Sequence, residues 1–233
     1  MGWTREALAY HSGLSWAAIS QIESGRRQEV RVSSLVALAS ALGVSVDYLV
    51  GGAATVSPQL LIHRALIYGS DEEYLAATVP FLLEGITREE CVLAVTGSRQ
   101  AGLLRDALGD NAAHVEFSAA SEWYTSLSGA ANGYRTFVSE RFEGGASWIR
   151  VIAEPVWTGW SEAEVAEWVR YESMINLALA SSPATVVCSY DTRSAPDTAI
   201  DGAPSTHPEL AGGCDATTNI AYREPQAFLL TDG

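Results

Sequence analysis

The stretch RALIYGSDEEYLAATVPFLLEGITREECVLAVT (residues 64–96) decides the fold of most of this 233-residue chain. It opens on a short apolar run, passes into a segment that starts at Ser70, and closes on a second apolar run at residues 91–96. Ser70 and Glu73 have the spacing of a capping box, in which each side chain satisfies the backbone N–H of the other residue, so a helix is expected to begin there. The order strand, helix, strand is typical of a parallel sheet covered by helices.

The same alternation continues toward the end of the chain. Further strands are expected over 114–118, 148–154, 184–190 and 226–230, with helices over 99–108, 130–142 and 161–181. Ser161 and Glu164 repeat the capping-box spacing at the start of the last helix. The main part of the chain is therefore predicted to be α/β, with a mainly parallel sheet and flanking helices.

The first fifty residues have a different pattern. In TREALAYHSGLSWAAISQIESGRR (4–27), Gly13 separates two helical stretches and can adopt the positive φ that a tight turn between them needs. Ser15 is a favourable N-cap for the second stretch. A third helix is expected over 33–43, and Ser45 is placed to cap a short fourth one. This segment is predicted to be a small all-α domain.

Charge divides the chain at the same place. Two domains are expected, 1–52 and 61–233, joined by a linker of small and polar residues at 53–60. The formal net charge is −14, and because the first domain holds as many arginines as acidic residues, the rest of the chain carries the whole deficit. Cations that neutralise phosphates supply most of the affinity for DNA, so the acidic part cannot be a DNA-contacting face.

Several classes of site lack support in the sequence. The three cysteines and four histidines are scattered without metal-ligand spacing, so no disulfide, metal or cofactor is expected. No Ser/His/Asp or Cys/His set falls at matching strand ends, which indicates no catalytic residues and no enzyme. Gly97 and Gly102 have P-loop spacing, but Leu103 and Leu104 stand where lysine and a hydroxyl residue are required, so ATP hydrolysis is not expected. Without an apolar run of about 18 residues or a signal-peptide pattern, the chain is expected to be cytoplasmic and free of membranes.

Residues 3–51 resemble the XRE family of lambda-repressor-like regulators, through T-x-E-x-L-A-x-x-x-G-x-S-x-x-x-I-S-x-I-E-x-G followed by L-A-x-A-L-G-V-S-x-D-x-L. The resemblance implies that the second helix of the motif enters the major groove of DNA. Glutamine can bond adenine through two hydrogen bonds, and arginine binds phosphates. The residues placed at DNA in this way are Arg5, Ser15, Trp16, Ala17, Gln21, Arg26 and Arg27.

One part of the XRE pattern is missing. The family's first helix would precede Gly2, so the remaining helices are expected to lean on the second domain or on a second subunit. Trp16 and Ala17 are also weak readers of base edges. The alternative is a helical dimerisation module that no longer binds DNA.

The second domain resembles the MEDS domain, the methanogen/methylotroph sensory domain. The resemblance spans roughly residues 61–231 and rests on four runs in order: HRALIYGSDEEYLAATVPFLLEG, EPVWTGWSEAEVAEWVRYESMINLALA, VVCSYDT and THPEL. It implies a RecA-like α/β core without ATPase chemistry, which senses small molecules such as hydrocarbon derivatives.

A ligand pocket is expected where the central strands end, because ligands of open α/β sheets bind beyond the carboxyl ends of the strands. Two polar residues four apart on the long helix are expected to face the same pocket. The predicted ligand-binding residues are Tyr68, Glu154, Trp157, Glu172, Asn176, Tyr190 and Asp191. The alternative is that the polar members only satisfy loop backbone groups.

Together these patterns predict a DNA-binding transcription regulator whose non-catalytic sensor takes a mainly apolar molecule with a polar end. Such a protein is expected to act as a homodimer on two operator half-sites one helical turn apart. The alternative is a protein-interaction switch of the anti-sigma type, in which the helical segment mediates assembly and the sensor docks a partner protein.

Overall fold

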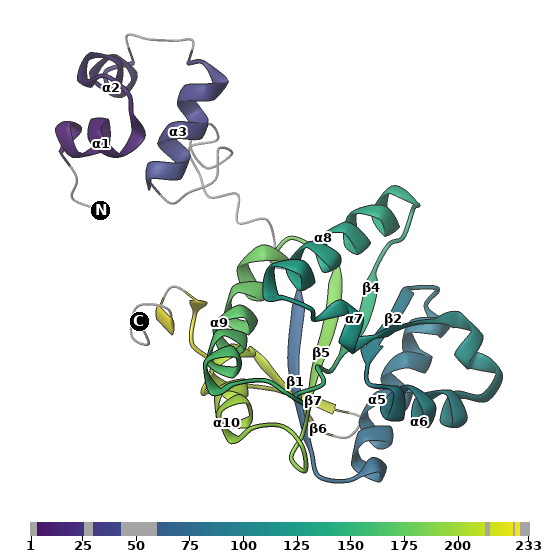
Figure 1. The fold of residues 1–233 in the computed structure, drawn as a ribbon. Helices are drawn as coiled ribbons and strands as arrows, with labels where there is room; N and C mark the ends of the chain where they lie inside the picture. Colours follow the sequence, from purple (N-terminus) through teal and green to yellow (C-terminus); the bar gives the residue numbers. More distant parts are fainter. Residues whose placement is uncertain (1–3, 26–29, 43–59, 213–214, 226, 229–233) are drawn as a thin grey trace. The chain divides into compact units, whose positions relative to one another are not determined.

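The computed structural model describes residues 4–25, 30–42, 60–212, 215–225 and 227–228. The chain divides into two compact units, residues 1–58 and 59–233 (Figure 1). The expected linker at 53–60, apart from Leu60, lies outside the described residues, as does the short helix predicted after Ser45. No described helix is long and apolar enough to cross a membrane.

The N-terminal unit begins as the sequence predicts. Among its described residues the helices are α1 (Arg5–Ser12), α2 (Trp16–Glu23) and α3 (Val32–Leu42). Between the first two, Gly13 has a φ of 67°, which glycine adopts without a steric penalty. The Oγ of Ser15 accepts a hydrogen bond from the N–H of Ala18, as expected for an N-cap. The predicted small helix-turn-helix domain is confirmed.

The second unit is built on a seven-stranded sheet. The strands are β1 (Ile62–Tyr68), β2 (Cys91–Thr96), β3 (Val115–Ala119), β4 (Ile149–Ala153), β5 (Ala184–Asp191), β6 (Glu209–Gly212) and β7 (Asp215–Thr218). Their order is β3-β2-β4-β5-β1-β6-β7, and every neighbouring pair is parallel except the hairpin of β6 with β7. The predicted mainly parallel α/β class is confirmed.

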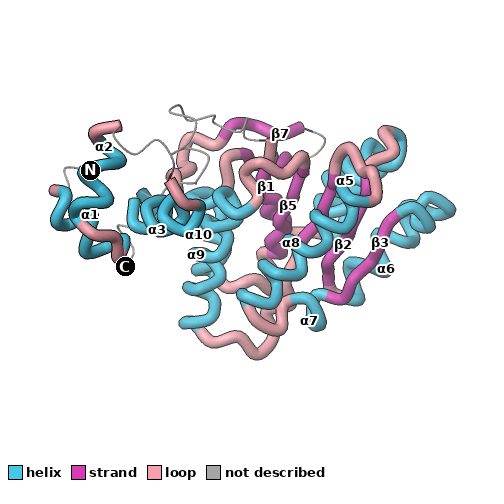
Figure 2. The backbone as a smooth tube through the Cα atoms, turned by 90° about the horizontal axis from the view of Figure 1, so that it is seen from above, coloured by secondary structure: helices cyan, strands magenta, loops and turns pink. Residues whose placement is uncertain are grey.

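Helices cover both faces of this sheet (Figure 2). They are α5 (Asp71–Thr87), α6 (Ser98–Leu108), α7 (Ala120–Trp123), α8 (Leu127–Glu143), α9 (Glu162–Ala178) and α10 (Asp197–Thr206), with a 3₁₀ turn at Gly109–His114. Apolar side chains of α5 and α6 share one core with one face of the strands, while those of α7 to α10 share a second core with the other face. Strand side chains alternate between these two cores, as the period of a strand requires.

The expected capping boxes form in two ways. At α9, the Ser161 Oγ accepts from the N–H of Glu164, and the Glu164 side chain accepts from the N–H of Ser161. At α5, Ser70 accepts from the N–H of Glu73, but the Glu73 carboxylate accepts from the N–H of Gly69 instead. Both helices thus begin where the spacing predicted.

The end of the chain departs from the prediction. The strand expected over 226–230 is wrong at its described residues, where Ala227 and Phe228 are helical and the N–H of Phe228 donates to the carbonyl of Glu224. Pro225 supplies the reason, because its fixed φ suits the first turn of a helix and it has no N–H to lose there. The last strands among the described residues are instead β6 and β7, which follow α10 and were not predicted.

Candidate functional site

The predicted pocket residues divide into two groups, and the first lies at the carboxyl edge of the sheet. The Tyr68 hydroxyl donates to Oε1 of Glu154 at 2.8 Å, and the Gln100 amide donates to the same oxygen at 3.0 Å. Glu154 is buried, and its Oε2 has no hydrogen-bond partner in the described part of the chain. Burial raises the pKa of Glu154 to about 8, so this carboxyl holds its proton at neutral pH.

Asp191, the third member of this group, is neutralised by arginine. It ends β5 opposite Tyr68, and its Oδ1 accepts from the backbone N–H and the Nε of Arg193 at 3.0 and 2.7 Å. The same guanidinium reaches Asp71 at 2.9 Å, and Asp71 also pairs with Arg99. The hydrogen bond from Arg193 holds the pKa of Asp191 below its usual range.

The other four predicted residues belong to the core on the opposite face of the sheet. Trp157 and Tyr190 stack with ring centroids 6.4 Å apart, and the Tyr190 ring meets His207 edge to face at 5.9 Å. Glu172 and Asn176 extend inward from α9 and are both buried. The sheet therefore separates Tyr68 from these residues, and the seven do not line one cavity.

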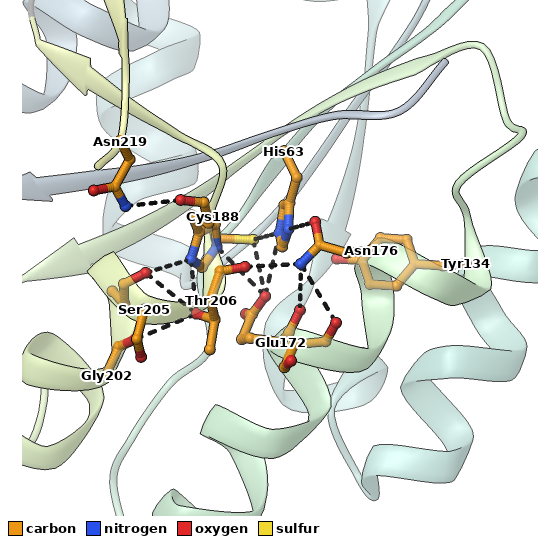
Figure 3. A network of polar contacts seen from close by, with 12 residues as sticks. His63, Tyr134, Glu172, Asn176, Cys188, Gly202, Ser205, Thr206 and Asn219 are labelled. Carbon is orange, nitrogen blue, oxygen red and sulfur yellow. Dashed lines mark hydrogen bonds and ion pairs between the residues drawn. The ribbon is translucent and has the colours of Figure 1, made fainter. Parts of the chain in front are cut away.

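Around Glu172 the structure assembles four side chains that could hold a metal ion, which we name the four-ligand cluster. Figure 3 labels three of them, His63, Glu172 and Cys188. The four are His63 on β1, Glu172 on α9, Cys188 on β5 and His207 directly after α10, and all are buried. Their ligand atoms lie within 4.8 Å of one another. The Nε2 of His63 is 3.3 Å from both the Cys188 Sγ and the Glu172 Oε2.

Hydrogen bonds behind the cluster fix both imidazole rings. The Asn176 amide nitrogen donates to the carbonyl of Thr206 at 2.8 Å, so its Oδ1 faces the Nδ1 of His63 at 3.1 Å as an acceptor. The Nδ1 of His207 lies 2.9 Å from the carbonyl of Ala203, which can only accept. Each ring therefore carries a proton on Nδ1 and, when neutral, directs the Nε2 lone pair into the cluster.

Burial keeps two of these groups uncharged. It is the main cause that lowers the pKa of His207 well below its usual range, with His63 adding to the effect. Burial also raises the pKa of the Cys188 thiol well above its usual range, and the nearby Glu172 adds to it. The Cys188 thiol can donate a hydrogen bond to the Glu172 carboxylate, at an Sγ–Oε2 distance of 3.5 Å.

A small cavity lies beside the cluster, with a volume of about 20 Å³. That is room for about one water molecule. Its lining is almost wholly apolar and comprises His63, Tyr124, Tyr134, Ala153, Trp168, Tyr171, Glu172, Ile175, Leu179, Val186 and Cys188. Trp157 and Trp160 pack on the outer side of Trp168, at centroid distances of 5.8 and 5.7 Å. The aromatic residues of this region thus enclose the cavity.

Sequence reasoning missed His63, Cys188 and His207. The expectation of no metal site rested on their separation along the chain, and the structure removes that ground by bringing them together. His63 and Cys188 also lie within the sheet and not at its carboxyl edge, since Cys188 pairs with Ala65 in the middle of β1. A signal was present, because the four runs that resemble the sensory domain each contain one member of the cluster.

In the N-terminal unit, the residues predicted to read DNA lie on the surface. Ser15, Trp16, Ala17 and Gln21 are exposed on and just before α2. The Trp16 indole donates to Glu6 at 3.0 Å, and Arg5 pairs with Glu23. Arg26 and Arg27 lie outside the described residues.

Comparison with known families matches both parts of the chain. The model of MEDS, the methanogen/methylotroph, DcmR sensory domain, matches residues 62–208, which include all four members of the cluster. A helix-turn-helix model matches residues 1–49. No curated protein and no solved structure matches the chain.

Proposed function

The chain belongs to the MEDS family and carries a helix-turn-helix domain before its sensory domain, and from this premise we propose how it senses and what it binds. A DNA-binding domain joined to a sensory domain is the architecture of a sensing transcriptional regulator, and no catalytic family is among the two matches. We infer that the sensory domain takes up a small, mainly apolar molecule and thereby changes how a homodimer holds DNA.

The DNA-binding half of the proposal rests on α2. Ala17 and Gln21 are exposed along this helix and the N-cap Ser15 is exposed just before it, so this surface is open to base edges in a major groove. Among them, Gln21 is the residue suited to bond adenine with two hydrogen bonds. A dimer would place two such helices on half-sites about 34 Å apart.

The observation that carries the sensing half is the cavity of about 20 Å³ beside Glu172. Its aromatic walls suit an apolar molecule, and three members of the four-ligand cluster, His63, Glu172 and Cys188, are among its lining residues. As it stands the cavity holds one water-sized molecule, so a larger ligand must displace rings such as Trp168 or Tyr171. Because Trp168 packs against Trp157 and Trp160, a displacement there would move the surface loop after β4.

DNA binding is tested by selecting preferred sequences from a random DNA pool with the full chain at stated salt. Gln21→Ala should weaken binding to the selected sequence by about 1–3 kcal/mol, roughly 5- to 150-fold, and relax the preference at one base. Tyr10→Ala, which changes another exposed side chain on α1, should bind like the wild type. If no DNA sequence is enriched, the DNA-binding proposal is contradicted and the protein-interaction alternative is favoured.

Sensing is tested by filling the cavity. Ala153 lines it, and Ala153→Leu should abolish any ligand-dependent change in DNA affinity while leaving ligand-free binding intact. Ala163→Leu, at the exposed start of α9, is the matched control. Native mass spectrometry of chain purified from its own host should show a retained small molecule in the wild type and not in Ala153→Leu. Equal retention by both would place the ligand elsewhere.

A further inference from the structure

We propose that His63, Glu172, Cys188 and His207 bind one divalent transition-metal ion, of which zinc is the best match, inside the sensory domain. This inference goes beyond the proposed function and does not depend on DNA binding. It rests on the distances between the four ligand atoms and on the hydrogen bonds that orient them. It also rests on the buried Glu172 carboxylate and imidazole nitrogens, which lack a cation within the cluster.

Four of the six separations among the ligand atoms fit a tetrahedral ion. Zinc bonds are about 2.0–2.1 Å to nitrogen or oxygen and about 2.3 Å to sulfur, so atoms at the corners of such a tetrahedron lie roughly 3.3–3.7 Å apart. Four of the distances between ligand atoms are 3.3 Å for His63 to Cys188, 3.3 Å for His63 to Glu172, 3.5 Å for Cys188 to Glu172 and 3.6 Å for His207 to Glu172. The two remaining separations, from His207 to His63 and to Cys188, lie within 4.8 Å, so His207 would move inward by up to about 1 Å when an ion binds.

The orientation of the rings fits ligation as well. Metal-bound histidines usually donate their second ring N–H to a carbonyl or carboxylate, which fixes the ring and turns the other nitrogen to the metal. Here Asn176 plays that part for His63, at 3.1 Å, and the Ala203 carbonyl plays it for His207, at 2.9 Å. Asn176 is itself held by the Thr206 carbonyl, on the segment that ends at His207 (Figure 3).

The protein alone leaves this cluster unsatisfied. The Nε2 of His207 makes no hydrogen bond within the described chain, although the side chain is fully buried. The Nε2 of His63, with its proton on the other nitrogen, lies 3.3 Å from both a carboxylate oxygen and the Cys188 sulfur, so the single thiol proton is shared between two acceptors. A buried acceptor without a partner, such as the Nε2 of His207, is rare and is explained by a bound ion or water. A cation at their centre would accept all four lone pairs at once.

The donor set selects the kind of metal. Two imidazoles, one sulfur and one carboxylate suit zinc and its neighbours in the first transition row, whereas calcium and magnesium require mostly oxygen ligands. On binding, Cys188 would lose its thiol proton to solvent and ligate as a thiolate. With four protein ligands the ion would tie together β1, β5, α9 and the start of the β6–β7 hairpin.

The test uses the full chain, stripped with a chelator and reloaded with zinc before gel filtration. Elemental analysis should find one zinc per chain. Cys188→Ser and His207→Gln should each weaken zinc binding at least about 100-fold, while Cys91→Ser and the exposed His114→Gln should leave it unchanged. Substoichiometric zinc in the wild type, or equal retention by the cluster variants and the controls, would overturn the proposal.

Two further measurements keep the test decisive if a cluster variant does not fold. Cobalt(II) added to the stripped wild type should give the intense visible bands of a tetrahedral site and a thiolate-to-cobalt charge-transfer band, and their absence would contradict the assignment. Asn176→Ala should weaken zinc binding about 10- to 100-fold, because it frees the His63 ring without removing a ligand. A wild-type zinc affinity in a folded Asn176→Ala protein would mean that His63 is not held for a metal.

Discussion

Three buried carboxyl groups in the sensory domain differ in how their negative charge is neutralised. On the α5 side of the sheet, Glu90 binds the buried guanidinium of Arg150, whose Nε lies 2.6 Å away. At the carboxyl edge, Glu154 keeps its proton, because burial raises its pKa to about 8. On the α9 side, the ion-pair partners of Glu172 among the described residues are the imidazoles of His63 and His207.

This difference supports the four-ligand cluster as a metal site. Arg150 also donates to Glu84 and to the Phe81 carbonyl, so that the charges and donors of that cluster are satisfied by the protein itself. Transferring a charge out of water costs several kcal/mol unless it is paired. A fold that balances Glu90 with arginine and Glu154 with a proton is expected to balance Glu172 too, and the metal ion supplies the missing cation.

The largest effect should come from breaking the self-sufficient cluster. Arg150→Met would leave Glu90 buried without a counter-ion, so the free energy of unfolding should fall by about 3–5 kcal/mol. Arg88→Met removes an exposed guanidinium that also pairs with Glu84 and should cost less than about 1 kcal/mol. Urea unfolding of both variants gives the values. A loss below about 1 kcal/mol for Arg150→Met would show that the buried Glu90 needs no cation. The same reasoning could then not require a cation for Glu172.

Glu154 should reveal itself through pH. The folded state holds a proton on Glu154 between the unfolded pKa of 4.5 and the folded pKa of about 8, so the unfolded state binds fewer protons there and stability falls as pH rises through this window. From pH 5 to pH 8 the loss should be roughly 3 kcal/mol. Glu154→Gln cannot ionise, and its unfolding free energy should lose that much less over the same range. Parallel pH profiles for the two proteins would show that Glu154 is ionised when folded.

The smallest change in unfolding free energy is expected at Glu172, which is proposed to bind a metal ion and not an arginine. In metal-stripped protein, Glu172→Gln removes a carboxylate that no arginine or lysine of the described residues pairs with, so its free energy of unfolding should stay within about 1 kcal/mol of the stripped wild type. Glu90→Gln, the matched change in the Arg150 cluster, should cost about 3 kcal/mol. If Glu172→Gln costs as much as Glu90→Gln, a protonated His63 already serves as the counter-ion.

The sequence predicted those parts of the fold that depend on local patterns. Gly13 and Ser15 place the turn and the N-cap of α2 within a few residues, and the capping residues of α5 and α9 do the same for the sensory domain. The segment from α10 to β7 escaped prediction because Gly202 and Pro204 interrupt the helical pattern of α10. The short strands that follow are defined by pairing with β1 and not by a run of their own.

The site was harder to predict because it depends on strand order. His63 meets Cys188 only because β5 lies beside β1, a neighbourhood that the chain order does not give. His207 joins them through the turn after α10. The rule that ligands bind at strand ends placed Tyr68 and Asp191 together correctly, but it directed attention to an edge whose charges arginine already balances.

The metal assignment is tested most directly by X-ray absorption at the zinc edge on the reloaded full chain. The account predicts a first shell of four atoms, with nitrogen or oxygen at about 2.0–2.1 Å, one sulfur at about 2.3 Å, and the outer-shell scattering of two imidazole rings. A shell of about six oxygen atoms without sulfur would show an adventitious surface ion and contradict the four-ligand cluster as a metal site.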